Sequence, residues 1–129
     1  MDNARLARTW LLLAGVILIA VGILGFFSNP LVGATGLVAT DNVHNVVHIL
    51  TGALALGLAY VMRQDIGTAA IAFGLLYGVV FVVTVVSPTL FGIFSVPVNG
   101  IDHVIHLGLA VVSIGLGYMA RGRSMAPAN

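Results

Sequence analysis

Four long apolar stretches alternate with short mixed segments along the chain. They cover about residues 9–27, 42–62, 67–86 and 101–120, and none of them contains Lys or Arg. A helix needs about 20 apolar residues to cross the hydrocarbon core of a bilayer. Because a lipid-exposed backbone must satisfy its own polar groups, helices are favoured over isolated strands. The pattern predicts an all-α membrane protein with four transmembrane helices.

Composition supports this assignment and excludes several classes of protein. Of the 129 residues, 60% are hydrophobic and 7% are charged, whereas a soluble domain carries about 25% charged residues. The chain has no Cys, which excludes disulfides and thiolate metal sites. It lacks the basic stripe that a nucleic-acid-binding protein needs. We expect one transmembrane domain over residues 1–129 in a lipid bilayer, with a flexible tail over 124–129.

The arginines predict the orientation of the helices. Arg5 and Arg8 precede the first apolar stretch, Arg63 lies between the second and third, and Arg121 and Arg123 follow the fourth. All five therefore fall on one side of the predicted bundle. The positive-inside rule places that side, with both termini, in the cytoplasm. The predicted location is the inner (plasma) membrane.

The chain also contains an internal repeat. Pro88 lies 58 residues after Pro30, and His106 lies 58 residues after His48. The same shift brings Tyr60 onto Tyr118 and Arg63 onto Arg121. The sequence therefore predicts two tandem helical hairpins, over about residues 9–63 and 67–121. Two copies in one orientation imply a pseudo-two-fold axis along the membrane normal.

Small residues and apolar loops add two further expectations. Three pairs of small residues have the spacing of close helix contacts, either within the bundle or between protomers. They are Gly74/Gly78, Ala53/Gly57 and Ser113/Gly117. The outer loops, residues 28–41 and 87–100, are unusually apolar. We expect these loops to lie in the membrane interface or to fold over the helix ends.

All four histidines lie near the outer ends of the second and fourth predicted helices. His44 and His48 are four residues apart and share a helix face, as do Asp102 and His106. His103 lies three residues before His106. Imidazole nitrogens suit zinc, copper, iron or nickel. The candidate ligands of a transition metal are therefore His44, His48, Asp102, His103 and His106, and a haem held axially by His48 and His106 is an alternative.

A purely structural interpretation of the same residues stays open. Asp41 and Asn99 are suitable N-cap residues, and Asp102 falls at the third helical position, where capping-box partners occur. His48 and His106 lie too deep for capping, but they could hydrogen-bond neighbouring helices. The cluster is thus a metal or haem site, a set of polar packing contacts, or a group of histidines with a proton-linked role.

Two segments carry a family resemblance. The chain has Asn-Pro-Leu-Val-Gly at residues 29–33 and Asn-Val-His-Asn-Val-Val-His at residues 42–48, followed by Gly52. It resembles the small four-helix bacterial membrane proteins grouped as domain of unknown function 4383. The resemblance implies an integral membrane protein and no established activity. Asp102 stands where the first half has His44, so a fully symmetric site is not expected.

These features favour a non-enzymatic protein, because no HExxH motif and no nucleophile–base arrangement is present. We expect a structural or accessory membrane subunit, as a homo-oligomer or in a larger membrane complex. A metal- or haem-binding protein of electron transfer or metal handling is the first alternative. An oligomeric channel or transporter lined by His48 and His106 is the second.

Overall fold

A computed structural model describes residues 2–124, with side chains as far as residue 122. Its helices are α1 (Asn3–Leu24), α2 (Asn42–Val61), α3 (Ile66–Val86) and α4 (Gly100–Ser124). All four are long and apolar enough to cross a membrane. The prediction of an all-α protein with four such helices is confirmed. The expected flexible tail lies outside the described residues, except for Ser124, which ends α4.

Helix α1 begins earlier than the apolar pattern predicts. The side chain of Asp2 accepts a hydrogen bond from the backbone N–H of Arg5, at 2.7 Å, and so caps the helix. The 22 residues of α1 span about 33 Å, which is slightly more than the hydrocarbon core. The cap therefore extends α1 through Arg5 and Arg8 on the polar side of the apolar stretch.

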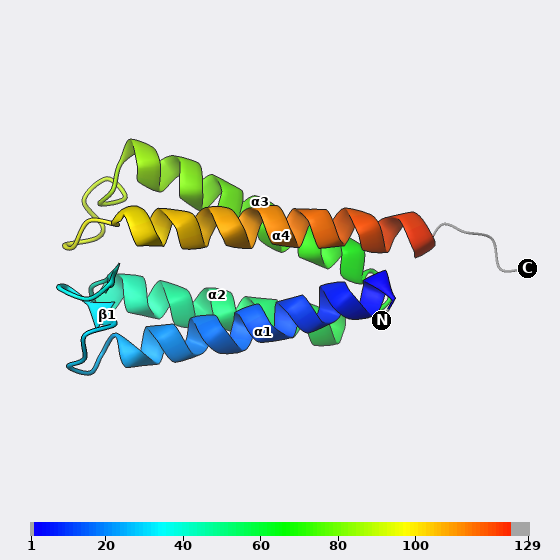
Figure 1. The fold of residues 1–129 in the computed structure, drawn as a ribbon, viewed down its shortest axis with the longest axis horizontal. Coiled ribbons are helices and arrows are strands. Elements are labelled where there is room, and N and C mark those ends of the chain that lie inside the picture. The colour runs from blue at the N-terminus through cyan, green and yellow to red at the C-terminus, as the bar shows by residue number, and fades with distance from the viewer. Residues whose placement is uncertain (1, 125–129) are drawn as a thin grey trace, which may run out of the picture.

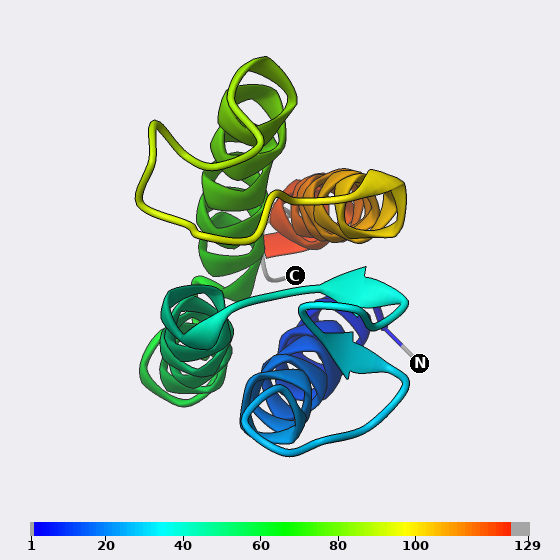
Figure 2. The same ribbon diagram turned by 90° about the vertical axis from the view of Figure 1, so that its left-hand side faces the viewer.

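The helices form two antiparallel pairs, α1 with α2 and α3 with α4, and the closest packing lies within each pair. Figure 1 shows the two pairs lying lengthwise against each other, with the start of α1 and the end of α4 at the same end of the bundle. Seen end-on, the four helices surround a common axis (Figure 2). Residues near the N-terminal ends of α2 and α4 can therefore meet inside the bundle.

Glycines allow the paired helices to approach closely. A Cβ added at Gly52 would lie 2.7 Å from the carbonyl oxygen of Gly15, and one added at Gly15 would lie 2.8 Å from that of Gly52. In the second pair, a Cβ at Gly74 would lie 2.9 Å from the carbonyl oxygen of Ala110. These spacings leave no room for a side chain, as expected for small-residue packing in lipid.

The two loops at residues 28–41 and 87–100 fold over the helix ends, which is one of the two arrangements expected for them. The first loop contains two short parallel strands, β1 (Val32–Gly33) and β2 (Val38–Ala39). In the second loop, Phe94 and Val98 are buried. Both loops lie at the end of the bundle opposite the start of α1 and the end of α4 (Figure 1), so they cover the end that carries the histidines.

Candidate metal centre

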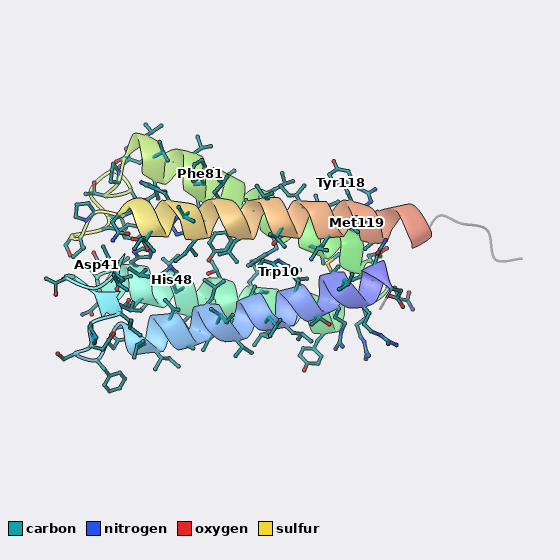
Figure 3. The ribbon with its side chains drawn as sticks, in the orientation of Figure 1. Trp10, Asp41, His48, Phe81, Tyr118 and Met119 are labelled. Carbon is teal, nitrogen blue, oxygen red and sulfur yellow. The ribbon has the colours of Figure 1, made fainter. Side chains whose placement is uncertain are left out.

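The start of α2 fixes the first two histidines. Asp41 is the N-cap residue, and its carboxylate accepts a hydrogen bond from the backbone N–H of His44 at 2.8 Å. His48 follows one turn later on the same face, as the spacing predicts. Both imidazoles are buried, with 2% and 4% of their surface exposed. Figure 3 shows Asp41 and His48 toward the loop end of the bundle.

Helix α4 supplies the third imidazole. The ring of His106 lies 6.1 Å from that of His44 and 6.5 Å from that of His48, while the rings of His44 and His48 are 4.3 Å apart. One nitrogen from each residue can be chosen so that the three lie within 4.8 Å of one another. We call His44, His48 and His106 the histidine cluster.

The cluster is short of hydrogen-bond partners. Within residues 2–124, no partner reaches the buried Nδ1 atom of any of its three members. Buried polar groups in proteins are almost always hydrogen-bonded, and each exception requires an explanation. The three Nδ1 atoms are therefore candidate ligand atoms; the buried Nδ1 of His103, which lies outside the cluster, has no partner among the described residues either.

A small cavity adjoins the cluster. Its volume is about 60 Å³, and its walls include the three imidazoles, Tyr77 and Thr51. The hydroxyl groups of Tyr77 and Thr51 lie 2.6 Å apart and hydrogen-bond to each other. A water molecule needs roughly 10–15 Å³ of such space, so the volume of the cavity is sufficient for a small molecule beside the imidazoles.

Asp102 and His103, the other two candidate ligands, do not join the cluster. The Asp102 carboxylate accepts hydrogen bonds from the backbone N–H of Asn99 at 3.0 Å and of Ala39 at 3.2 Å. The Asn99 side chain accepts one from the backbone N–H of Asp102 in return, at 3.0 Å. This reciprocal pair is a capping box at the start of α4. His103 instead presents its ring edge-on to Phe81, with centroids 6.2 Å apart.

Asp41 ties the second loop to α2. Its second carboxylate oxygen accepts hydrogen bonds from the backbone and hydroxyl of Ser95 and from the backbone N–H of Val96. Partial burial raises the pKa of Asp41, but the hydrogen bonds from His44, Ser95 and Val96 outweigh burial and hold the pKa below its usual value. The carboxylate therefore stays ionised and brings negative charge to the loop end of the bundle.

The family of the chain is clear from sequence comparison. A family model described as a domain of unknown function, DUF4383, matches residues 8–119. The chain belongs to the DUF4383 family. No curated protein and no solved structure matches it. The DUF4383 match confirms the resemblance expected from the segments at residues 29–33 and 42–48, and the four apolar helices make this DUF4383 member a multi-pass membrane protein.

Sequence reasoning missed several residues around the cluster of this DUF4383 chain. Phe94 stacks on His44, with centroids 4.7 Å apart, and the hydroxyl pair of Thr51 and Tyr77 lies beside the cavity. Tyr77 gave a usable signal, because it is a polar side chain in the middle of an otherwise apolar stretch. Phe94 gave only a weak one, as part of an apolar outer loop.

Proposed function

We propose that this protein is a non-enzymatic accessory membrane protein that holds one transition metal ion in the histidine cluster. One observation carries the proposal: three buried imidazoles from α2 and α4 place ligand nitrogens within 4.8 Å of one another. Zinc bound to imidazoles has metal–nitrogen distances of about 2.0–2.1 Å, which puts two nitrogens about 3.3 Å apart in a tetrahedron. Modest side-chain rotations would close the cluster around an ion.

A role in packing alone is less well supported. Polar packing contacts would satisfy both nitrogens of each imidazole. His44 does have a backbone hydrogen bond with Ala39, yet the Nδ1 atom of every cluster member has no partner among the described residues. Leaving a buried polar group unsatisfied costs about 1–3 kcal/mol. A bound ion would take one nitrogen from each of the three imidazoles.

A single ion fits the site better than a haem. The cavity beside the cluster has a volume of about 60 Å³, whereas pockets for large organic ligands occupy about 300–1,000 Å³. The ring of His44 lies close to the rings of both His48 and His106. A haem macrocycle therefore cannot lie between His48 and His106. Three nitrogen ligands without thiolate suit zinc, copper, iron or nickel. The fourth ligand would come from the small cavity.

A channel lined by His48 and His106 is the weaker alternative. Both side chains are buried inside one chain, at 4% and 2% exposure, so neither faces a pore between protomers. The two positions point into the protein rather than toward a second copy.

We place both termini in the cytoplasm. Four arginines lie at or near helix ends on one side of the bundle, namely Arg5, Arg8, Arg63 and Arg121. The positive-inside rule assigns that side to the cytoplasm.

The tandem repeat is supported by matching helix contacts. A Cβ at Gly15 would meet Gly52 and Leu56, and 58 residues after these lie Ala110 and Ile114, which a Cβ at Gly74 would meet. Gly74 itself lies 59 residues after Gly15, so the match on that side is shifted by one residue.

Metal analysis of the purified membrane protein tests the proposal. We expect about one transition metal ion per chain, either as purified or after titration with Zn²⁺ or Co²⁺ in detergent. His48→Ala and His106→Ala should each abolish binding. His103→Ala is the matched control, because His103 lies on the same helix but outside the cluster. A folded protein that takes up none of these ions would refute the proposal, as would equal loss in all three variants.

A further inference from the structure

A second, larger cavity lies between the two helix pairs, and His48 is the one member of the histidine cluster in its wall. It has a volume of about 380 Å³ and is bounded by α1 and α4. The wall includes Ala14, Ile17 and Val21 from α1 and Ile105, Gly108 and Leu109 from α4. This volume is in the range of pockets that hold organic ligands. Neither the family nor the proposed metal site accounts for it.

The wall of the cavity offers almost no polar partner. Trp10 lies in the wall at one end, and its indole N–H already donates to the hydroxyl of Ser113 at 2.7 Å. Val38 of β2 lies in the wall at the loop end. His48 is the one ionisable residue among the lining residues. Water needs two to four polar partners to remain in a cavity, so these walls favour an apolar occupant.

The cavity is elongated along the helices. On α1 its wall extends from Trp10 to Val21, which corresponds to about 16 Å of helix, and on α4 from Ile105 to Val112, about 10 Å. Both helices belong to the set that is long and apolar enough to cross a membrane. The cavity thus runs parallel to the direction of lipid chains at hydrocarbon depth.

We propose that one acyl chain of a bilayer phospholipid occupies this cavity between α1 and α4. A methylene chain matches the elongated shape and the aliphatic walls, and the bilayer supplies it at high concentration. Filling the space restores dispersion contacts that the wall atoms would otherwise lack. The inference is independent of the metal, because only His48 lies in the wall of both cavities.

Two glycines of α4 provide a blocking variant and its control. A Cβ added at Gly108 or at Gly115 would meet no atom within 4 Å. Gly108 lines the cavity, whereas Gly115 is exposed on the helix surface and does not line it. Gly108→Leu should therefore put its side chain into the cavity, and Gly115→Leu should change only the outer surface.

Trp10 is the only tryptophan of the chain, which makes it a reporter at the cavity wall. The probe is a phosphatidylcholine with brominated acyl chains, titrated into the full-length protein in detergent. We expect saturable quenching of Trp10 fluorescence at about one lipid per chain. Gly108→Leu should reduce this quenching at least twofold, and Gly115→Leu should leave it unchanged.

The experiment can fail in ways that overturn the proposal. Equal quenching in the wild type, Gly108→Leu and Gly115→Leu would mean that the lipid contacts only the outer surface. A dimer that excludes the brominated lipid would mean that a second copy fills the cavity. If Gly108→Leu does not fold, as judged by circular dichroism, Val112→Phe provides a second blocking variant at the wall, with the same expected reduction.

Discussion

The ring of Phe94 lies nearly parallel to the imidazole of His44, with centroids 4.7 Å apart and an angle of 12° between the planes. Phe94 belongs to the loop between α3 and α4, whereas His44 opens α2. The second helix pair therefore covers a histidine supplied by the first. Because Phe94 is only 5% exposed, its ring shields the cluster at the loop end of the bundle.

Removing this ring should make a bound metal ion easier to lose. In Phe94→Ala, solvent and chelators reach His44, so zinc should dissociate from the protein at least several-fold faster. Stopped-flow transfer of zinc to a chromophoric chelator measures the rate. Phe91→Ala is the control, because Phe91 lies in the same loop but is 77% exposed. Equal rates in both variants would show that Phe94 does not protect the site.

The cap at Asp41 should stabilise the protein more than the corresponding residue of α3. Asp41→Ala removes hydrogen bonds to His44, Ser95 and Val96, and loss of an N-cap typically costs about 0.5–2 kcal/mol. Asp65→Ala is the matched control, since Asp65 precedes α3 without a side-chain cap hydrogen bond. Thermal unfolding in detergent should show a lower midpoint for Asp41→Ala only.

The same carboxylate predicts a pH dependence. Because the folded state holds the pKa of Asp41 below its ordinary value of 3.8, its stabilising effect is complete above that value and is lost as the pH falls through the lower folded pKa. The wild type should therefore begin to lose its advantage over Asp41→Ala as the pH falls below about 4. The difference between the two midpoints, measured between pH 3 and 7, should narrow toward the acid end. A constant difference across this range would contradict the assignment.

The sequence was sufficient to predict the helices and part of the site. Four apolar stretches predicted α1 to α4, and the spacing of His44 and His48 predicted their common face. Asn99 and Asp102 have the spacing of a capping box, and the structure contains that box. Each of these features is local, so periodicity and spacing within one segment are enough to find it.

The remaining features depend on how separate segments meet. The repeat placed His48 and His106 at equivalent positions, but only the packed bundle selects His106 over His103 as the third member of the cluster. Likewise, Ala53 and Gly57 have the spacing of a helix contact, yet Ala53 is exposed and a Cβ at Gly57 would meet no atom within 4 Å. That pair makes no close helix contact within the described chain, and its use between protomers stays a prediction.

The close approach of Gly15 and Gly52 should limit what can replace either residue. A Cβ at Gly52 would lie 2.7 Å from a backbone oxygen of Gly15, so Gly52→Val should push α1 away from α2. We expect a loss of about 1–3 kcal/mol of stability, as in other overpacked cores. Gly57→Val on the same helix is the control, because its position is open. Unfolding curves in a mild detergent should separate the two variants, and equal stability would contradict this packing.

If the cluster holds an ion, three imidazoles leave a fourth coordination position beside the 60 Å³ cavity. Metal sites with three protein ligands and an open position bind water or another small ligand there. Adding azide to the Co²⁺-loaded protein should therefore shift its visible absorption bands without releasing the ion.

The variant Tyr77→Phe tests the wall of that cavity, because it removes the hydroxyl that pairs with Thr51 at 2.6 Å. A hydrogen bond contributes about 0.5–1.5 kcal/mol, so the affinity for azide should change about two- to tenfold. Tyr60→Phe, at an exposed position on α2, should leave azide affinity unchanged. A cobalt spectrum insensitive to azide would show that a side chain occupies the fourth position, whereas an absence of cobalt binding would refute the metal site itself.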